Sequence, residues 1–152
     1  MDALDWVSDL APVVLRALLA ALCGAVVGLE RELRGKPAGL KTNALICLGA
    51  AVYVHFGQLL TESGQGDPTR IPGQVVTGMG FIGAGAIIRE RGAVLGLTTA
   101  ATLWVVAGIG VFVGTGWFAP AIGLTAVTVG TLLILGMVER VTVRGHRPIP
   151  PE

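Results

Sequence analysis

Five apolar stretches dominate the pattern of hydrophobic and polar positions along the chain. They cover residues 12–29, 42–60, 71–88, 97–114 and 118–138, and each is close to the ~20 residues that a helix needs to cross a bilayer. The third stretch is the least hydrophobic and is rich in glycine, so its helix should depend on neighbouring helices. The pattern predicts an all-α polytopic membrane protein with about five transmembrane helices in one domain over residues 12–138.

Short segments flank this domain. In residues 1–11, Asp2, Asp5 and Asp9 lie opposite apolar residues at helical spacing. This arrangement predicts an interfacial helix on the outer side and argues against a cleaved signal, which would begin with Lys or Arg. Residues 139–152 end in RGHRPIPPE, and this short, proline-rich stretch predicts a disordered cytoplasmic tail.

The distribution of positive charge predicts the orientation. Hydrophobic residues make up 53% of the chain and charged residues only 14%, so few charges remain to mark the loops. On one side of the membrane, the loops and the tail contain nine Lys and Arg residues. On the other side, the loops contain a single one, Arg70. The nine are Arg31, Arg34, Lys36, Lys41, Arg89, Arg91, Arg140, Arg144 and Arg147. Cytoplasmic loops carry the excess of Lys and Arg. We therefore expect the N-terminus outside and the C-terminus in the cytoplasm.

Small residues at helical spacing indicate how the helices pack. Glycine pairs four residues apart allow helix backbones to approach closely in a membrane. The packing candidates are Gly24, Gly28, Gly78, Gly80, Gly83, Gly85, Gly110 and Gly114. The alternative is that glycine is simply common in membrane helices. Because three segments share the pattern, we favour close helix packing.

Several classes of activity find no support in the sequence. Residues 78–83 match G-x-G-x-x-G, but they lie inside an apolar span and not between a strand and a helix, as a dinucleotide site requires. Asp and Glu are missing from the middle of every predicted span, whereas proton- and cation-coupled pumps usually bury such carboxylates. Cys23 and Cys47 lie in apolar runs and behave best as small hydrophobic residues. We expect no enzyme, because no nucleophile and base are spaced for catalysis.

An outer polar layer is the first candidate site. Arg16, His55 and Gln74 each lie four to five residues from the outer end of a predicted span, which is roughly 6 to 8 Å deep. Asp67 and Arg70 lie just above them. One interpretation is a vestibule that binds a ligand or ion between the first three helices. The other is that Arg16 extends to the headgroups and His55 satisfies a backbone carbonyl.

An inner polar layer is the second candidate site. It comprises Glu30, Arg31, Glu32, Asn43, Arg89, Thr98 and Thr99. The threonine hydroxyls are suited to cap the helix that begins near residue 97, and Glu30 and Glu32 are candidate ligands for a hard cation. The alternative is a charged collar at the membrane surface, so we assign no metal site.

Three blocks of sequence resemble one family. They are GLERELRGKPAGLKTNALICLGAA (28–51), DPTRIPGQVVTGMGFIGAGAIIRERG (67–92) and GLTTAATLW (96–104). The chain thus resembles the MgtC/SapB (YhiD-like) family of bacterial inner-membrane proteins. The matching positions are Glu30, Arg31, Gly39, Leu40, Thr42, Asn43, Asp67, Arg70, Gln74, Gly78, Gly80, Gly83, Gly85, Arg89, Gly96, Thr98, Thr99 and Trp104.

The resemblance implies a function in magnesium homeostasis. It implies about five transmembrane helices with the N-terminus outside, and an action on other membrane proteins. Virulence-linked members continue into a soluble domain and tend to have Asn where this chain has Thr98 and Cys where it has Val105, and both differences argue against a virulence-type role here.

We therefore expect a non-enzymatic inner-membrane protein that acts by contact with partner membrane proteins. The alternative is a passive conduit or carrier for a small ion or solute, formed by an oligomeric bundle. The expected partners are the lipid bilayer, further copies of the chain and another membrane protein, but no nucleic acid. We expect no cofactor, and only the resemblance links the chain to Mg²⁺.

Overall fold

The chain folds into five helices and one small hairpin. The structure, a computed structural model, describes residues 5–64, 66–90 and 93–144. The elements are α1 (Asp5–Leu33), α2 (Leu40–Glu62), α3 (Arg70–Ala86), β1 (Ile88–Glu90), β2 (Ala93–Leu95), α4 (Leu97–Gly114) and α5 (Phe118–Arg144). The predicted all-α class is confirmed, since each of the five apolar stretches corresponds to one helix.

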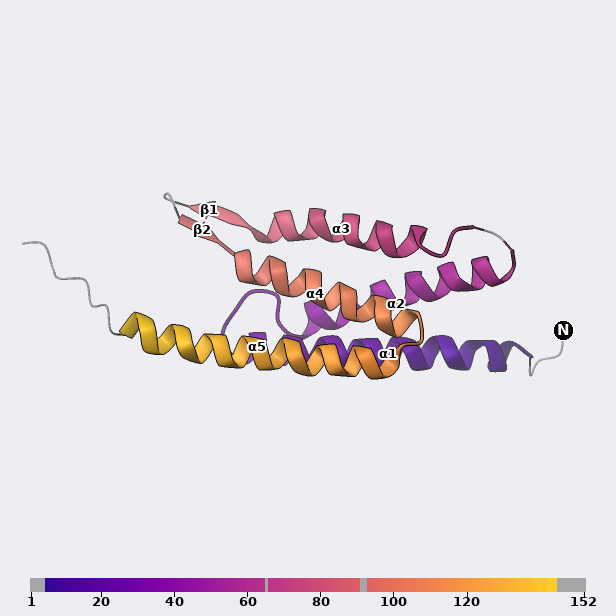
Figure 1. Ribbon diagram of the computed structural model, residues 1–152, viewed down its shortest axis with the longest axis horizontal. Helices are drawn as coiled ribbons and strands as arrows, with labels where there is room; N and C mark the ends of the chain where they lie inside the picture. Colours follow the sequence, from indigo (N-terminus) through magenta and orange to yellow (C-terminus); the bar gives the residue numbers. More distant parts are fainter. Residues whose placement is uncertain (1–4, 65, 91–92, 145–152) are drawn as a thin grey trace, which may run out of the picture.

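The helices lie side by side and alternate in direction (Figure 1). α1 packs along α2 and also contacts α4 and α5, whereas α3 lies at the opposite edge of the bundle and packs mainly on α4. The start of α1 and the α2–α3 connection lie at one end of the molecule, and the hairpin and the end of α5 lie at the other. α2 and α4 therefore form the centre of the bundle.

Four helices are long and apolar enough to cross a membrane. These stretches are Leu10–Leu33, Leu40–Glu62, Leu97–Gly114 and Phe118–Thr142. α3 has 17 residues, which makes it about 25 Å long at 1.5 Å per residue. This is shorter than the hydrocarbon core of ~30 Å. The chain is thus a polytopic membrane protein in which α3 is the shortest of the five predicted spans.

The predicted boundaries at both termini change. α1 runs from Asp5 through Pro12 without a break, so residues 5–11 continue into the first span and do not form a separate interfacial helix. Residues 1–4 lie outside the described residues. α5 continues to Arg144, so residues 139–144 are helical and not a disordered tail, and residues 145–152 again lie outside the described residues.

The hairpin between α3 and α4 was not predicted. α3 ends at Ala86, and Arg89 pairs with Val94 in the hairpin. Arg89, a member of the predicted inner layer, therefore lies in a strand beyond the end of α3. Gly96, the residue before α4, has a φ of +88°, and a Cβ at this position would clash with the Ala86 carbonyl oxygen. Glycine tolerates both the positive φ and the close approach.

Glycines hold α1 and α4 against α2. A Cβ at Gly28 of α1 would lie 2.6 Å from Leu40 Cα, and one at Gly114 of α4 would lie 2.6 Å from the Ala51 carbonyl oxygen. Gly24 and Gly110 approach the α2 backbone as closely. Around these contacts the buried core contains Ala20, Cys23, Val27, Cys47, Ala51, Val106, Ile109, Val113 and Ala121.

The glycines of α3 behave differently. A Cβ at Gly78, Gly80 or Gly85 would meet nothing within 4 Å, and one at Gly83 would lie 3.8 Å from Ala100 Cβ. α3 is anchored by Met79, its one buried residue among those described. The packing role predicted for Gly78, Gly80 and Gly85 is therefore not used within one copy of the chain.

Two matched substitutions should distinguish glycines that contact a neighbouring helix from glycines that do not. We expect Gly114→Ala to destabilise the bundle by about 1–3 kcal/mol, since the added methyl group overpacks the α2 contact. Gly123→Ala, at a position where a Cβ meets nothing within 4 Å, should be neutral or stabilising by up to ~1 kcal/mol through helix propensity. Thermal unfolding in detergent measures both, and equal effects would contradict the assignment.

Candidate functional site

Arg16 joins three helices at one end of the bundle. Its NH1 nitrogen lies 2.7 Å from His55 Nδ1, 3.1 Å from Gln58 Oε1 and 2.6 Å from the Gly114 carbonyl oxygen. The guanidinium also lies 6.0 Å from the centre of the Phe118 ring. His55 is buried and Arg16 half-buried. We call Arg16, His55, Gln58 and the Gly114 carbonyl the Arg16 cluster.

The Arg16 cluster caps a helix as well as joining helices. Gly114 is the last residue of α4, and the last carbonyls of a helix have no partner within it. Arg16 supplies that partner from α1, and Gln58 Nε2 donates to the next carbonyl, that of Thr115, at 3.4 Å. Arg16 thus points into the bundle. Gln58, one turn after His55, is a member of this cluster that the hydrophobic pattern did not predict.

The other residues of the predicted outer layer lie apart from this cluster. Asp67 and Arg70 are exposed near the start of α3. Asp67 Oδ1 accepts hydrogen bonds from Thr69 Oγ1 at 2.7 Å and Thr69 N at 2.8 Å, and these bonds lower the pKa of Asp67. Its role is to fix the turn that leads into α3. Gln74 faces a groove described below.

A second cluster lies at the opposite end of α1. Glu30 Oε1 lies 2.6 Å from Arg34 Nε, and Glu30 Oε2 lies 3.9 Å from Arg31 NH1. Glu30 and Arg31 are buried, and Arg34 reaches the Leu133 carbonyl of α5 at 3.5 Å. One carboxylate between two guanidinium groups leaves this Glu30 cluster with a net positive charge.

Side chains also fix the turn between α1 and α2. Glu32 Oε2 accepts a hydrogen bond from Leu40 N at 2.9 Å and so caps the start of α2. The fully buried Asn43 donates through Nδ2 to the carbonyls of Ala38 and Gly39. Ala38 has a φ of +57°, which is uncommon for a residue with a side chain. The Asn43 amide therefore holds a strained turn.

The remaining residues of the predicted inner layer take other positions. α4 begins after Gly96 without a side-chain cap, so the predicted capping by Thr98 and Thr99 is wrong. Thr99 is buried, and Thr98 is exposed with its carbonyl accepting a hydrogen bond from Thr102. Arg89 is exposed in β1.

The described residues do not fit a Mg²⁺ site. Among the side chains that the structure describes, no group of three His, Cys, Asp or Glu could hold a metal ion. Glu30 is paired with two guanidinium groups and Glu32 with a backbone amide. Hard cations bind several oxygen ligands together, and these carboxylates do not converge in that way.

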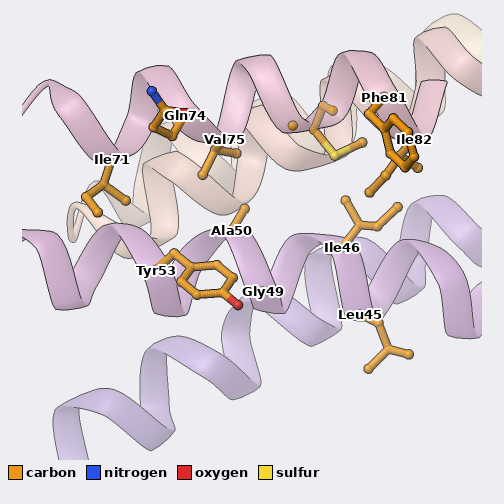
Figure 2. Close-up of a pocket in the computed structure, with 12 residues that line it drawn as sticks. Leu45, Ile46, Gly49, Ala50, Tyr53, Ile71, Gln74, Val75, Phe81 and Ile82 are labelled. Atoms are coloured by element: carbon orange, nitrogen blue, oxygen red, sulfur yellow. The ribbon is translucent and has the colours of Figure 1, made fainter. Parts of the chain in front are cut away.

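An open apolar groove lies between α2 and α3 (Figure 2). Its volume is about 650 Å³. Gln74 and Tyr53 are the polar side chains on its walls, and they come from opposite helices. The other lining residues are Leu45, Ile46, Gly49, Ala50, Ile71, Val75, Gly78, Met79, Phe81 and Ile82. The sequence could not predict the groove, because it depends on α3 packing mainly on α4 and less on α2.

The fold and the polar clusters at both ends of the bundle define a polytopic membrane protein. Residues 17–141 match the model of the MgtC family, and the chain belongs to this family. The resemblance found in the sequence is therefore confirmed.

Known relatives are similar over most of this chain. Protein MgtC of Salmonella typhimurium is 45% identical over 124 residues, which are 82% of this chain and 52% of the relative. YhiD of Escherichia coli, whose name proposes a magnesium transporter, is 42% identical over 137 residues, which are 86% of this chain and 62% of YhiD. Protein MgtC of Brucella abortus is 48% identical over 102 residues, which are 67% of this chain and 42% of the relative.

The chain spans about half the length of the curated relatives it matches. No solved structure is detectably similar to it.

Substitution of Asn43 tests the strained turn. Asn43→Ala removes the two hydrogen bonds that the buried Asn43 amide donates to the Ala38 and Gly39 carbonyls, and it should cost about 1–3 kcal/mol of unfolding free energy. Asn43→Asp should cost more at neutral pH, because carboxylate oxygens would then face carbonyl oxygens. The exposed Thr42→Ala serves as the control. Denaturant or thermal unfolding in detergent measures these effects, and an Asp variant as stable as wild type would contradict the donor role.

Proposed function

We propose that this MgtC family member acts in magnesium or general ion homeostasis, without enzymatic activity, by contact with partner membrane proteins in the bacterial inner membrane. Support comes from the family and from the name of YhiD. Because the relatives extend beyond the matched region, the proposal concerns the membrane bundle. The positive charges at its Glu30 end favour an orientation with that end in the cytoplasm.

The observation that carries this proposal is the closed core between the two polar clusters. Val27, Val106 and Val113 are each 0% exposed, and Ile109 is 1% exposed. The close glycine contacts of α1 and α4 on α2 lie at the same levels. A single copy in this state therefore separates the Arg16 cluster from the Glu30 cluster by packed apolar side chains, which supports an action through contacts on its sides.

The groove and the open face of α3 provide a surface for such contacts. Gly78, Gly80 and Gly85 expose helix backbone at positions where small residues favour the approach of another transmembrane helix. Phe81, 86% exposed, projects from the same helix. We propose that a transmembrane helix of a partner protein packs along α3.

The second candidate is a passive conduit formed by several copies. Gln74 favours it, because this residue, which carries an amide, is among those that line the groove between α2 and α3. Copies that met across α3 would enclose this group together with Tyr53. In this case ion or solute flux would need no partner protein.

One substitution on α3 distinguishes the two candidates. Gly80→Leu fills an open position on α3, and Gly123→Leu fills an open position on α5. We expect the proposed partner protein to co-purify with wild type and with Gly123→Leu, but not with Gly80→Leu, because the bulky side chain blocks close approach of its helix to α3. Both variants should fold as well as wild type. Mass spectrometry after purification in mild detergent measures the loss.

Flux assays on the same proteins test the conduit. Purified wild-type protein in liposomes should give no Mg²⁺ flux above that of empty liposomes. Robust flux without a partner would overturn the contact role and favour the conduit. Equal retention of the partner by both leucine variants would instead remove α3 from the contact surface.

The orientation has its own test. Ser63 lies at the Arg16 end and Lys36 at the Glu30 end, and both are exposed. In intact cells with a permeable outer membrane, Ser63→Cys should react with a membrane-impermeant maleimide, and Lys36→Cys should react only after lysis. The wild-type chain, with Cys23 and Cys47 buried, gives the background. The reverse labelling would contradict the assigned orientation.

A further inference from the structure

The contact between Arg16 and His55 sets the protonation state of the imidazole. A guanidinium has only donors, so a nitrogen bonded to it must act as an acceptor. His55 Nδ1, 2.7 Å from Arg16 NH1, therefore carries a lone pair. The ring proton lies on Nε2, and the imidazole is neutral. Histidine is the side chain that ordinarily changes its charge between about pH 5 and pH 8.

Protonation of Nδ1 would remove the acceptor and place two positive charges in contact. The neighbouring elements offer little compensation. α1 contributes Arg16 itself, α4 the Gly114 carbonyl, and α5 the Phe118 ring. α2 contributes Gln58 and, two turns beyond His55, the exposed Glu62. α3 contributes Ile71, which contacts α2 at Gly57, and its charged Arg70 is exposed.

The same Arg16 nitrogen also bonds the end of α4 and Gln58 of α2. Displacement of the guanidinium from a protonated His55 would therefore release the α4 cap and the link between α1 and α2 in one step. The carboxylates of the described residues make ion pairs only at Glu30, at the other end of the bundle. Among the side chains that the structure describes, which begin at Leu10, no carboxylate other than Glu30 makes an ion pair, so none of them holds the Arg16 cluster together after protonation.

We propose that the Arg16 cluster is a pH-sensitive clamp. With neutral His55 the clamp is closed and joins α1, α2 and α4. With protonated His55 the clamp opens and loosens this end of the bundle. In the proposed orientation the clamp responds to the pH outside the cytoplasmic membrane. The clamp is a property of the bundle and does not depend on whether the chain acts through a partner.

Thermal unfolding of the full chain in nanodiscs between pH 8 and pH 5 tests the clamp. The wild-type midpoint should fall on acidification by roughly 3 °C or more. His55→Gln retains a neutral acceptor and should largely abolish this dependence. Arg16→Gln removes the opposing charge and should also flatten the profile, with a lower midpoint at pH 8. A profile that is the same in wild type and both variants would overturn the proposal.

A spectroscopic measurement keeps the test decisive if a variant fails to fold. The chain contains two histidines, His55 and His146, so His146→Gln leaves His55 as the single imidazole. Nitrogen-15 NMR of this protein at pH 8 should show a neutral ring with the proton on Nε2. Acidification should convert it to the doubly protonated form together with chemical-shift changes at Gly114 and Gln58. A proton on Nδ1 at pH 8, or a titration without those changes, would refute the clamp.

Discussion

The close approach of α1 and α4 to α2 is the constraint on which the rest of the structure depends. In a bilayer, lipid tails are as apolar as the helix surfaces, so helices gain stability from close packing more than from removal of apolar surface from water. Gly24 and Gly28 on one side of α2, and Gly110 and Gly114 on the other, make this packing possible. They also bring Arg16, His55 and the end of α4 within hydrogen-bond distance, since larger residues would hold the helices apart.

Hydrophobic pattern predicted the helices well because each span must satisfy its own backbone in lipid. The same pattern could not predict the β-hairpin between α3 and α4, because its strands β1 and β2 have only three residues each. It also missed the continuation of α5 to Arg144, because the amphiphilic last turns resemble a charged tail. Thr98 and Thr99 were predicted to cap α4. The helix instead begins directly after Gly96, whose positive φ turns the backbone before either threonine, and it has no side-chain cap.

The candidate site was predictable in part. Depth along the helices correctly grouped Arg16 with His55. The same criterion placed Gln74 in their layer, although Gln74 lines the groove between α2 and α3, apart from the Arg16 cluster. The partners of Arg16 depend on which helix faces which, and a backbone carbonyl such as that of Gly114 leaves no signal in side-chain chemistry. Likewise, the glycine patterns of three segments look alike in sequence, yet only those on α1 and α4 lie against the backbone of another helix within one copy.

The α1–α2 turn has a consequence for biosynthesis. Its stabilising contacts, from Glu32 to Leu40 and from Asn43 to Ala38 and Gly39, join residues at most eight positions apart. Contacts of such short sequence separation form early and at little entropic cost. The pair of helices α1 and α2 can therefore form during synthesis, before the later helices enter the lipid. α4 and α5 then pack on this preformed pair. The Arg16 cluster, which needs the end of α4, is completed only after this pair is in place.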